Sequence, residues 1–303
     1  MLRELLILVV ALSPAPQAAP GAVLPASCEN PVPAIGTYVD LEIAIPGARW
    51  ITATGLNERR DVIGIFADEG SSLTQSFLWS RNELTLLAVP GATSTYAADI
   101  NASGTVVGAY EDAAGRHGFS WRRGRFTLYP RSPWMRALDF RAINNSGAIA
   151  GSYGVQPEGE TAFVWHASGT TEIDVSDRPW DFPVSINDRF DVLLISYRRP
   201  GPGRGQYFVA SRDVIEPVQG CGDLDGFQGL LHTVTNDGTL VGRRRASSSS
   251  FSGVAYTTDG VTLFDYPGAE STELIDMNSA GYAVGTATIG TGRRVFMFVP
   301  HGR

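Results

Sequence analysis

The sequence contains no lysine, so its 24 basic residues are all arginine, against 31 acidic residues. The resulting net charge of −7 argues against nucleic acid as a general partner. The four histidines show no spacing typical of a metal site, and no phosphate loop, dinucleotide fingerprint or Gly-x-Ser-x-Gly nucleophile motif is present. We therefore expect no cofactor and no metal, and we assign no catalytic residue.

Long apolar runs and helix-period patterns are also missing. The apolar run Leu5–Leu12 is too short to span a membrane, so no membrane span is expected. It follows Arg3 and precedes small residues, which is typical of an export signal over 1–20. Residues 21–35 are rich in proline and alanine and are expected to form a disordered lead-in. These features predict a secreted or periplasmic protein.

Cysteine is scarce as well, with Cys28 and Cys221 as its two positions. An even pair in an exported protein favours a disulfide. The eight residues from Cys28 to Gly36 span roughly 26–29 Å when extended, which is long enough to permit a bridge but does not require one. The sequence leaves this pairing open.

A repeated unit organises the rest of the chain, and its clearest copy runs from Val89 to Trp121. The recurring anchor is an asparagine, at intervals of 44, 43, 43, 49 and 42 residues: Asn57, Asn101, Asn144, Asn187, Asn236 and Asn278. A glycine follows seven residues later in four copies: Gly64, Gly108, Gly151 and Gly285. In the other two copies, Gly242 comes one residue early and Leu194 replaces the glycine. The spacing indicates six copies of one unit.

Each unit is predicted to contain four short strands, which in the second copy are 96–100, 105–110, 118–121 and 125–129. Four strands in a period of about 40–45 residues are typical of a β-propeller blade. The last unit has only three strands, and the segment 37–45 matches the missing fourth. We predict an all-β, six-bladed β-propeller over 36–303, closed by pairing of the N-terminal strand with the C-terminal blade.

The repeat resembles that of the HAF-repeat extracellular proteins, a family named for the stretch that reads His117-Gly118-Phe119 here. The Pro-Gly-Ala, Ile-Asn-x-x-Gly and Val-Val-Gly segments of the second copy are also similar to that repeat. The resemblance covers most of 36–303. It implies export and a propeller-like repeat, and it implies no reaction.

The connections of such a ring leave alternately on its two faces. The turns that contain the anchor asparagines lie on one face, and we interpret these residues as structural because asparagine bonds its own turn. The second-to-third hairpins and the links between blades lie on the other face. Arginine gathers in the hairpins of three adjacent units, and acidic residues gather in the other three. The arginines proposed as ligand-binding residues are Arg198, Arg199, Arg243, Arg244, Arg245, Arg293 and Arg294.

Forked guanidinium groups bind carboxylate and phosphate, so this basic half-ring predicts an anionic ligand. The alternative is that these arginines are solvated hairpin tips. Tryptophan and aspartate on the same face suggest a second kind of ligand, a sugar whose apolar side stacks on indole. The candidates are Trp50, Trp134, Trp180, Asp177 and Asp181. The alternative for each tryptophan is a wedge between adjacent blades.

We predict a monomeric, non-catalytic binding or scaffold propeller whose partner is an extracellular glycan or other anionic polymer. The alternative is a carbohydrate-active hydrolase or lyase that uses carboxylates at the mouth of the ring. Such a pair would lie roughly 5–10 Å apart. Its candidates are Asp139, Asp177, Asp181, Asp223 and Asp225. A third possibility is a structural surface protein with no small ligand.

Overall fold

The computed structural model describes residues 30–155, 159–198, 205–212, 214–218 and 229–302. Regular structure in these residues consists of twenty-five strands, without a helix, so the prediction of an all-β chain is confirmed. It follows that these residues contain no helix long and apolar enough to cross a membrane. The predicted export signal, most of the lead-in and both cysteines lie outside the described residues.

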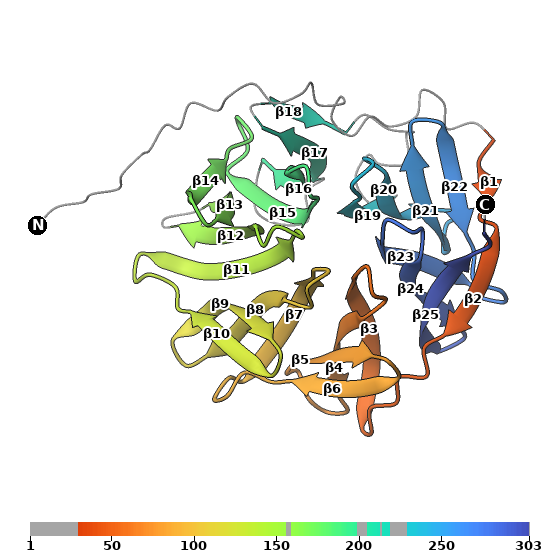
Figure 1. Cartoon of the computed structure of the whole chain (residues 1–303), viewed down its shortest axis with the longest axis horizontal. Coiled ribbons are helices and arrows are strands. Elements are labelled where there is room, and N and C mark those ends of the chain that lie inside the picture. The colour runs from red at the N-terminus through yellow and green to blue at the C-terminus, as the bar shows by residue number, and fades with distance from the viewer. Residues whose placement is uncertain (1–29, 156–158, 199–204, 213, 219–228, 303) are drawn as a thin grey trace, which may run out of the picture.

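The strands follow one another as antiparallel meanders, and Figure 1 shows these sheets arranged around a common centre. The first meander is β3 (Ala48–Leu56), β4 (Val62–Asp68), β5 (Gln75–Ser80) and β6 (Glu83–Leu87). The second is β7 (Ser94–Ile100), β8 (Val106–Asp112), β9 (Gly115–Arg122) and β10 (Arg125–Tyr129). The third is β11 (Met135–Ile143), β12 (Ile149–Val155), β13 (Glu160–His166) and β14 (Gly169–Ile173).

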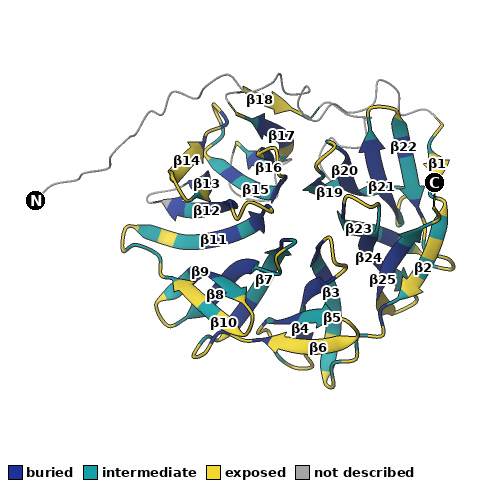
Figure 2. Cartoon of the chain, viewed as in Figure 1, coloured by how far each residue is buried: buried dark blue, intermediate teal, exposed yellow. Residues whose placement is uncertain are grey.

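The remaining strands repeat this order. The fourth meander is β15 (Trp180–Ile186), β16 (Asp191–Tyr197), β17 (Gln206–Ser211) and β18 (Val214–Pro217). The fifth is β19 (Gly229–Val234), β20 (Leu240–Arg245), β21 (Phe251–Thr257) and β22 (Gly260–Phe264). The sixth starts with β23 (Ser271–Met277), β24 (Ala283–Ile289) and β25 (Gly292–Pro300). Outer strands such as β6 and β18 are largely exposed, whereas second strands such as β4 and β16 are mostly buried (Figure 2).

An N-terminal strand, β2 (Gly36–Asp40), completes the sixth meander by pairing antiparallel with β25. Tyr38 lies opposite Phe298 in this ladder, so the predicted pairing of the N-terminal segment with the last strand is present. The strand ends at Asp40, however, and not at Ile45. Leu41 N still donates to the backbone of β25, but Ile43 N then donates to Leu41 O at 2.6 Å. This tight turn takes the chain out of the ladder and toward β3.

The described end of the lead-in is ordered, contrary to the expectation of disorder over 21–35. β1 (Val32–Pro33) pairs parallel with β22, the outer strand of the fifth meander. Ala34 N continues this contact by donating to Leu263 O at 2.8 Å. The chain from β1 to β2 therefore crosses the outer edges of the fifth and sixth meanders (Figure 1).

The recurring glycine has a steric reason. A Cβ on Gly108 would lie 1.9 Å from Tyr96 O of the neighbouring strand and 2.9 Å from the ring of Phe119. Gly64, Gly151, Gly242 and Gly285 meet a first-strand carbonyl in the same way, at 1.9–2.4 Å. In the fourth copy Leu194 pairs with Pro183 at this position. Close approach of the first two strands thus selects glycine.

The hydrophobic core lies between adjacent meanders. One cluster joins Ile63 and Leu87 of the first meander to Ile100, Val106 and Phe119 of the second. Each of these side chains is at most 3% exposed. Burial of a side chain of this size contributes about 1.5–3 kcal/mol, so these contacts hold neighbouring meanders together.

Candidate functional site

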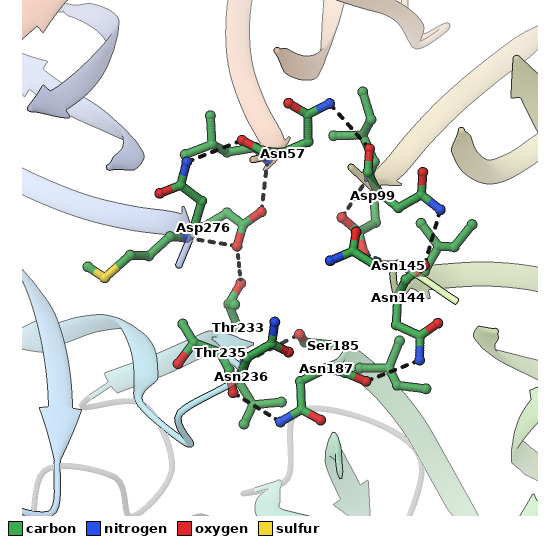
Figure 3. Close-up of a pocket in the computed structure, with 18 of the residues that line it drawn as sticks. Asn57, Asp99, Asn144, Asn145, Ser185, Asn187, Thr233, Thr235, Asn236 and Asp276 are labelled. Atoms are coloured by element: carbon green, nitrogen blue, oxygen red, sulfur yellow. Dashed lines mark hydrogen bonds between the residues drawn. The ribbon is translucent and has the colours of Figure 1, made fainter. Parts of the chain in front are cut away.

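The anchor asparagines join adjacent meanders at the inner ends of the first-to-second turns (Figure 3). Asn144 is representative: its Oδ1 accepts from Ala148 N of its own turn at 2.9 Å. Its Nδ2 donates across to Asn187 O of the fourth meander at 3.2 Å. The other anchors that donate to the backbone of the next meander are Asn57, Asn101, Asn187 and Asn278. The amides are already engaged, which supports the structural interpretation.

The fifth anchor is Thr235, and the prediction of Asn236 for this position is wrong. Thr235 N donates to Thr239 O at 2.9 Å, as the anchor N–H groups of the other turns do. Asn236 is the next residue; it is exposed and its amide bonds Asp188. With Thr235 as anchor, Gly242 falls seven residues later, as in the other copies. The hydroxyl of Thr235 donates within its own turn.

Other polar groups connect the fifth and sixth meanders. Thr233 Oγ1 donates to Ile275 O at 3.0 Å and to Asp276 Oδ1 at 3.1 Å. His232 Nε2 lies 2.8 Å from Glu273 Oε1. This junction therefore relies on hydroxyl and ionisable side chains where most other junctions use the amide of an anchor asparagine.

Every first strand contains a β-bulge three residues before its anchor position. The bulged residues are Thr54, Ala98, Arg141, Val184, His232 and Ile275. A bulge breaks the alternation of a strand and redirects its side chains. Together with the anchor turns, most of these residues line a cavity of about 100 Å³ at the asparagine face.

Asp99 and Asp276 are the carboxylates deep in this cavity, and Figure 3 shows them on opposite sides of it. Asp99 accepts from Ile100 N at 2.7 Å and from Ile143 N of the next meander at 2.8 Å. Asp276 occupies the equivalent position and accepts from Leu56 N at 2.8 Å. Burial, and then repulsion from Asp276, raises the pKa of Asp99 to about 7. Burial raises the pKa of Asp276 to about 6.

The basic half-ring predicted on the opposite face is largely engaged in internal contacts. Arg243 pairs with Glu273 at 3.2 Å and stacks over Phe251, with Cζ 4.4 Å from the ring centre. Arg245 donates to Ser248 O at 2.9 Å and also lies over Phe251. Arg244 is half-buried on β20. Arg243 and Arg245 thus have internal partners, and their proposed role in binding an anion stays a prediction.

The other predicted arginines differ in their surroundings. Arg294 pairs with Asp40 at 2.6 Å, a contact that connects β25 to the N-terminal strand. Arg198 and Arg293 are exposed. Arg199 lies outside the described residues. Arg294 is thus part of the closure of the sixth meander.

The three predicted tryptophans have different environments. Trp50 is half-buried in β3, opposite Ala67. Trp134 is 58% exposed, and its ring meets the ring of Tyr153 edge-on, with centroids 5.3 Å apart. Trp180 is half-buried at the start of β15, where it pairs with Glu160 of the third meander. Trp180 therefore lies at a junction between meanders, as the wedge interpretation predicts.

A mixed aromatic and charged cluster lies where the third meander meets the fourth. The Arg136 guanidinium stacks over Trp180, with Cζ 5.5 Å from the ring centre, and lies 3.6 Å from Glu160 Oε2. The side chain of Arg136 is 45% exposed. The absence of a Cβ on Gly154 leaves room for both charged groups, which lie 3.1–3.2 Å from where that atom would be. We name Trp134, Tyr153, Arg136, Glu160 and Trp180 the aromatic–arginine cluster. Tyr153 packs toward the second meander, whereas Arg136 and Glu160 meet Trp180 of the fourth.

Glu160 is buried within this cluster and accepts from Ser152 Oγ at 3.0 Å. Burial is the main cause that raises the pKa of Glu160 above its usual range. Asp181 is also buried, and it accepts from Ser196 Oγ and from Val175 N. Asp177 is exposed, with a left-handed φ of 66°. The candidates Asp223 and Asp225 lie outside the described residues.

Asp139 also has partners that occupy its carboxylate. Arg116 Nε donates to Asp139 Oδ1 at 2.6 Å, and Arg141 Nη2 lies 3.6 Å from Oδ2. The described residues contain no group of three or more His, Cys, Asp or Glu side chains placed to hold a metal ion. Internal bonds thus engage all four carboxylates; Asp139 and Asp181 are buried, whereas Asp99 and Asp276 also line the cavity.

The sequence reasoning missed Arg136, Glu160 and Tyr153 as members of one site. Asp99 and Asp276 were not among the carboxylates that the sequence put forward. A signal was present: aspartate occurs two residues before the anchor in the second and sixth copies, whereas the equivalent residues elsewhere are Gly55, Ala142, Ser185 and Thr233. Two charged residues at a position that is otherwise small are a departure from the repeat.

No protein-family model and no curated protein matches this chain. Solved structures are similar in fold. A gluconolactonase from Xanthomonas campestris is 14% identical, with a TM-score of 0.52, over 93% of this chain and 98% of that one. The lectin SapL1, solved with α-methyl fucoside, is 10% identical, with a TM-score of 0.52, over 86% and 95%. The β-propeller domain of a Pyrococcus furiosus protease is 8% identical, with a TM-score of 0.50, over 86% and 84%.

At such low identity these likenesses concern the fold alone. They place the chain among all-β proteins similar to β-propellers. The proteins of similar fold include a lectin and gluconolactonases.

Proposed function

We propose that the six sequence repeats form the six blades of one propeller over 36–303, closed by β2. Supporting this, β2 supplies the fourth strand of the last meander, and Asn278 Nδ2 donates to Asn57 O, so the sixth meander contacts the first. The resemblance to HAF-repeat proteins and the apolar run near the amino end support export to the periplasm or the medium.

We further propose that this exported, monomeric propeller binds a neutral extracellular glycan at the aromatic–arginine cluster. The observation that carries this is the 58% exposure of Trp134, whose ring meets Tyr153 edge-on; Arg136, Glu160 and Trp180 lie on the side of the third meander that meets the fourth. An indole stabilises a fold mainly through the part of its surface that packs against protein. Most of the surface of Trp134 has no protein contact, so this part is open to a ligand. A sugar ring offers an apolar side for stacking and hydroxyls for the nearby charged groups.

A neutral glycan fits this face better than an anionic polymer. Binding of a polyanion needs cations that can exchange water for phosphate or carboxylate, and Arg243 and Arg294 are already paired with Glu273 and Asp40. Arg136 is likewise balanced by Glu160. The cluster thus offers fixed donors and acceptors with little net charge, which is suited to hydroxyl groups.

Binding without catalysis is the better interpretation for this face. Asp181 and Asp139 are buried, at 3% and 5% exposed, and are bonded to Ser196 and Arg116, so a ligand cannot reach either carboxylate. The similar fold of a lectin solved with α-methyl fucoside supports the same interpretation.

A glycan-array screen of the purified protein, with matched variants, tests this proposal. We expect retention on neutral glycans and a loss of about tenfold or more in affinity for Trp134→Ala, because a central stacked tryptophan contributes at least about 1.4 kcal/mol. Leu86→Ala is the control, since Leu86 is also 58% exposed but lies on the outer strand β6. Failure of every neutral glycan to bind, or equal losses in both variants, would overturn the proposal.

A further inference from the structure

The cavity at the asparagine face is separate from the glycan cluster and has different chemistry. It lies at the inner ends of the first strands, on the face opposite the second-to-third hairpins, and holds about 100 Å³. A single buried water needs roughly 10–15 Å³ measured in this way, so the cavity has room for several waters or one small organic molecule. A polymer chain does not fit into such a volume.

Two carboxylates line the cavity from opposite sides (Figure 3). Asp99 and Asp276 belong to the second and sixth meanders, which flank the first. The equivalent residue of the first meander is Gly55, and a Cβ there would lie 3.2 Å from Asp99 Oδ1. Because Gly55 has no side chain, the two carboxyl groups face the same space, and each remains partly exposed to the cavity.

The bulged residues of the third and fifth meanders supply cationic or basic groups to the same cavity. Arg141 lines it, and the buried Nε of Arg141 has no hydrogen-bond partner among the described residues. His232 also lines it, with Nε2 held by Glu273 at 2.8 Å, which leaves Nδ1 as the second ring nitrogen. Thr54, Ser185 and Thr233 complete the wall with hydroxyls. The remaining charged groups that line the cavity are Glu58 and Asp188.

We propose that this cavity is an acid–base site that hydrolyses a small ester or lactone. The ionised carboxylate of Asp276 removes a proton from a water molecule, whose oxygen forms a bond to the carbonyl carbon. The guanidinium of Arg141 stabilises the oxyanion of the tetrahedral intermediate. Collapse of the intermediate breaks the carbon–oxygen bond to the leaving group, which takes a proton from protonated Asp99.

The products of this step are an alcohol and a carboxylic acid, and atoms and protons balance. The proton lost by the water resides on Asp276 and the proton of Asp99 is on the alcohol, so one proton passes between the pair through solvent to restore the starting state. No oxidant, reductant or second substrate is needed. For a lactone the alcohol and the acid remain in one molecule, which keeps the substrate small.

The surroundings of the two carboxyl groups allow the pair to hold one proton. Both lie deep in the protein, and burial together with mutual repulsion raises the pKa of Asp99 to about 7, against about 6 for Asp276. Near neutral pH the pair therefore holds both an acid and a base, the condition for proton transfer in both directions. Backbone N–H donors stabilise the ionised form of a carboxylate. A site built only to hold such bonds would keep both carboxylates ionised, whereas burial here raises both pKa values.

Hydrolysis of p-nitrophenyl acetate and of glucono-δ-lactone by the full chain tests the proposal. We expect turnover above the buffer rate, with a bell-shaped dependence of kcat/KM on pH. Asp276→Asn and Asp99→Asn should each lose about 10²-fold or more, as is typical for loss of a general acid or base. Arg141→Gln should lower kcat more than it changes KM. Glu83→Gln, on the exposed outer strand β6, is the matched control and should retain the wild-type rate.

Three results would overturn the proposal. The first is a wild-type rate equal to buffer for both substrates. The second is activity within threefold of wild type in an Asp→Asn variant that circular dichroism shows to be folded. The third is a flat pH profile of the wild type, which needs no variant and is independent of any loss of folding. Glycan binding at the opposite face is measured separately, so its failure and the failure of hydrolysis are distinguishable.

Discussion

Replacement of an anchor asparagine tests which residues hold the ring of meanders together. Asn144→Ala removes an acceptor for Ala148 N at 2.9 Å and for Ser146 Oγ at 2.7 Å, and a donor to Asn187 O. Asn144 and Ala148 are 3% and 1% exposed, so water cannot easily replace these bonds. An unsatisfied buried group costs about 1–3 kcal/mol and a lost hydrogen bond about 1 kcal/mol; the variant leaves Ala148 N unpaired and removes one of the two bonds that Asn187 O accepts, while Phe190 N still donates to it. We expect a loss of about 2–4 kcal/mol in the free energy of unfolding.

The control is Asn236→Ala. This asparagine fits the sequence motif as well as Asn144 does, but it lies one residue beyond the anchor position and is exposed. Its bonds to Asp188 are replaced by water, so the loss should stay below about 1 kcal/mol. Scanning calorimetry should distinguish Asn144→Ala from Asn236→Ala. In a protein of this size each kcal/mol lost lowers the Tm by about 2–4 °C, so we expect the Tm of Asn144→Ala to fall by roughly 5–15 °C. Equal shifts for both variants would refute the assignment of Thr235 as the fifth anchor.

Two further predictions concern charged groups. Arg243→Glu places a second acid beside half-buried Glu273. After a discount for the partial exposure of both side chains, we expect the free energy of unfolding to fall by about 2 kcal/mol and the Tm by roughly 5 °C. An unchanged Tm would show that this ion pair does not contribute to stability. Burial raises the pKa of Asp99 and of Asp276, so the stability gained from their protonated forms is complete below about pH 4 and is lost as pH rises through about 6 to 7. Urea unfolding should therefore show the wild type losing stability from about pH 5 to about pH 8, relative to the double Asp→Asn variant. A difference that does not change with pH would contradict this.

The strand order was largely predictable because the structural requirements of each meander select particular residues at fixed positions in the sequence. The turn chemistry after each anchor, and the glycine required where two strands approach closely, recur at nearly constant intervals. The segment near the amino end carries the same Pro-Gly-Ala signal as the fourth strands of other units, which made its pairing with β25 predictable. The fifth anchor was missed because adjacent Thr235 and Asn236 both form a turn, and only the backbone bonds distinguish them.

The sites were less predictable because they depend on contacts between neighbouring meanders. Arg243 looked available on its hairpin strand, but Glu273, its partner, comes from the next meander, and no local pattern specifies that register. The bulge in each first strand interrupts the two-residue alternation, so the sequence does not show that Arg141 and His232 line the cavity. The indole of Trp134 is exposed, and its role as a ligand contact stays a prediction; the other members of the cluster come from several different strands.

Isothermal titration of a neutral glycan selected from the array tests the central claim most directly. Wild type, Trp134→Ala and Arg293→Glu would be titrated in buffers of low and high salt. The account predicts a Kd that changes less than about twofold with salt, a loss of about tenfold or more in Trp134→Ala, and wild-type affinity in Arg293→Glu, because stacking and hydroxyl contacts are little screened. A steep loss of affinity with salt, or dependence on Arg293 and not on Trp134, would contradict it and would place the ligand on the arginine hairpins.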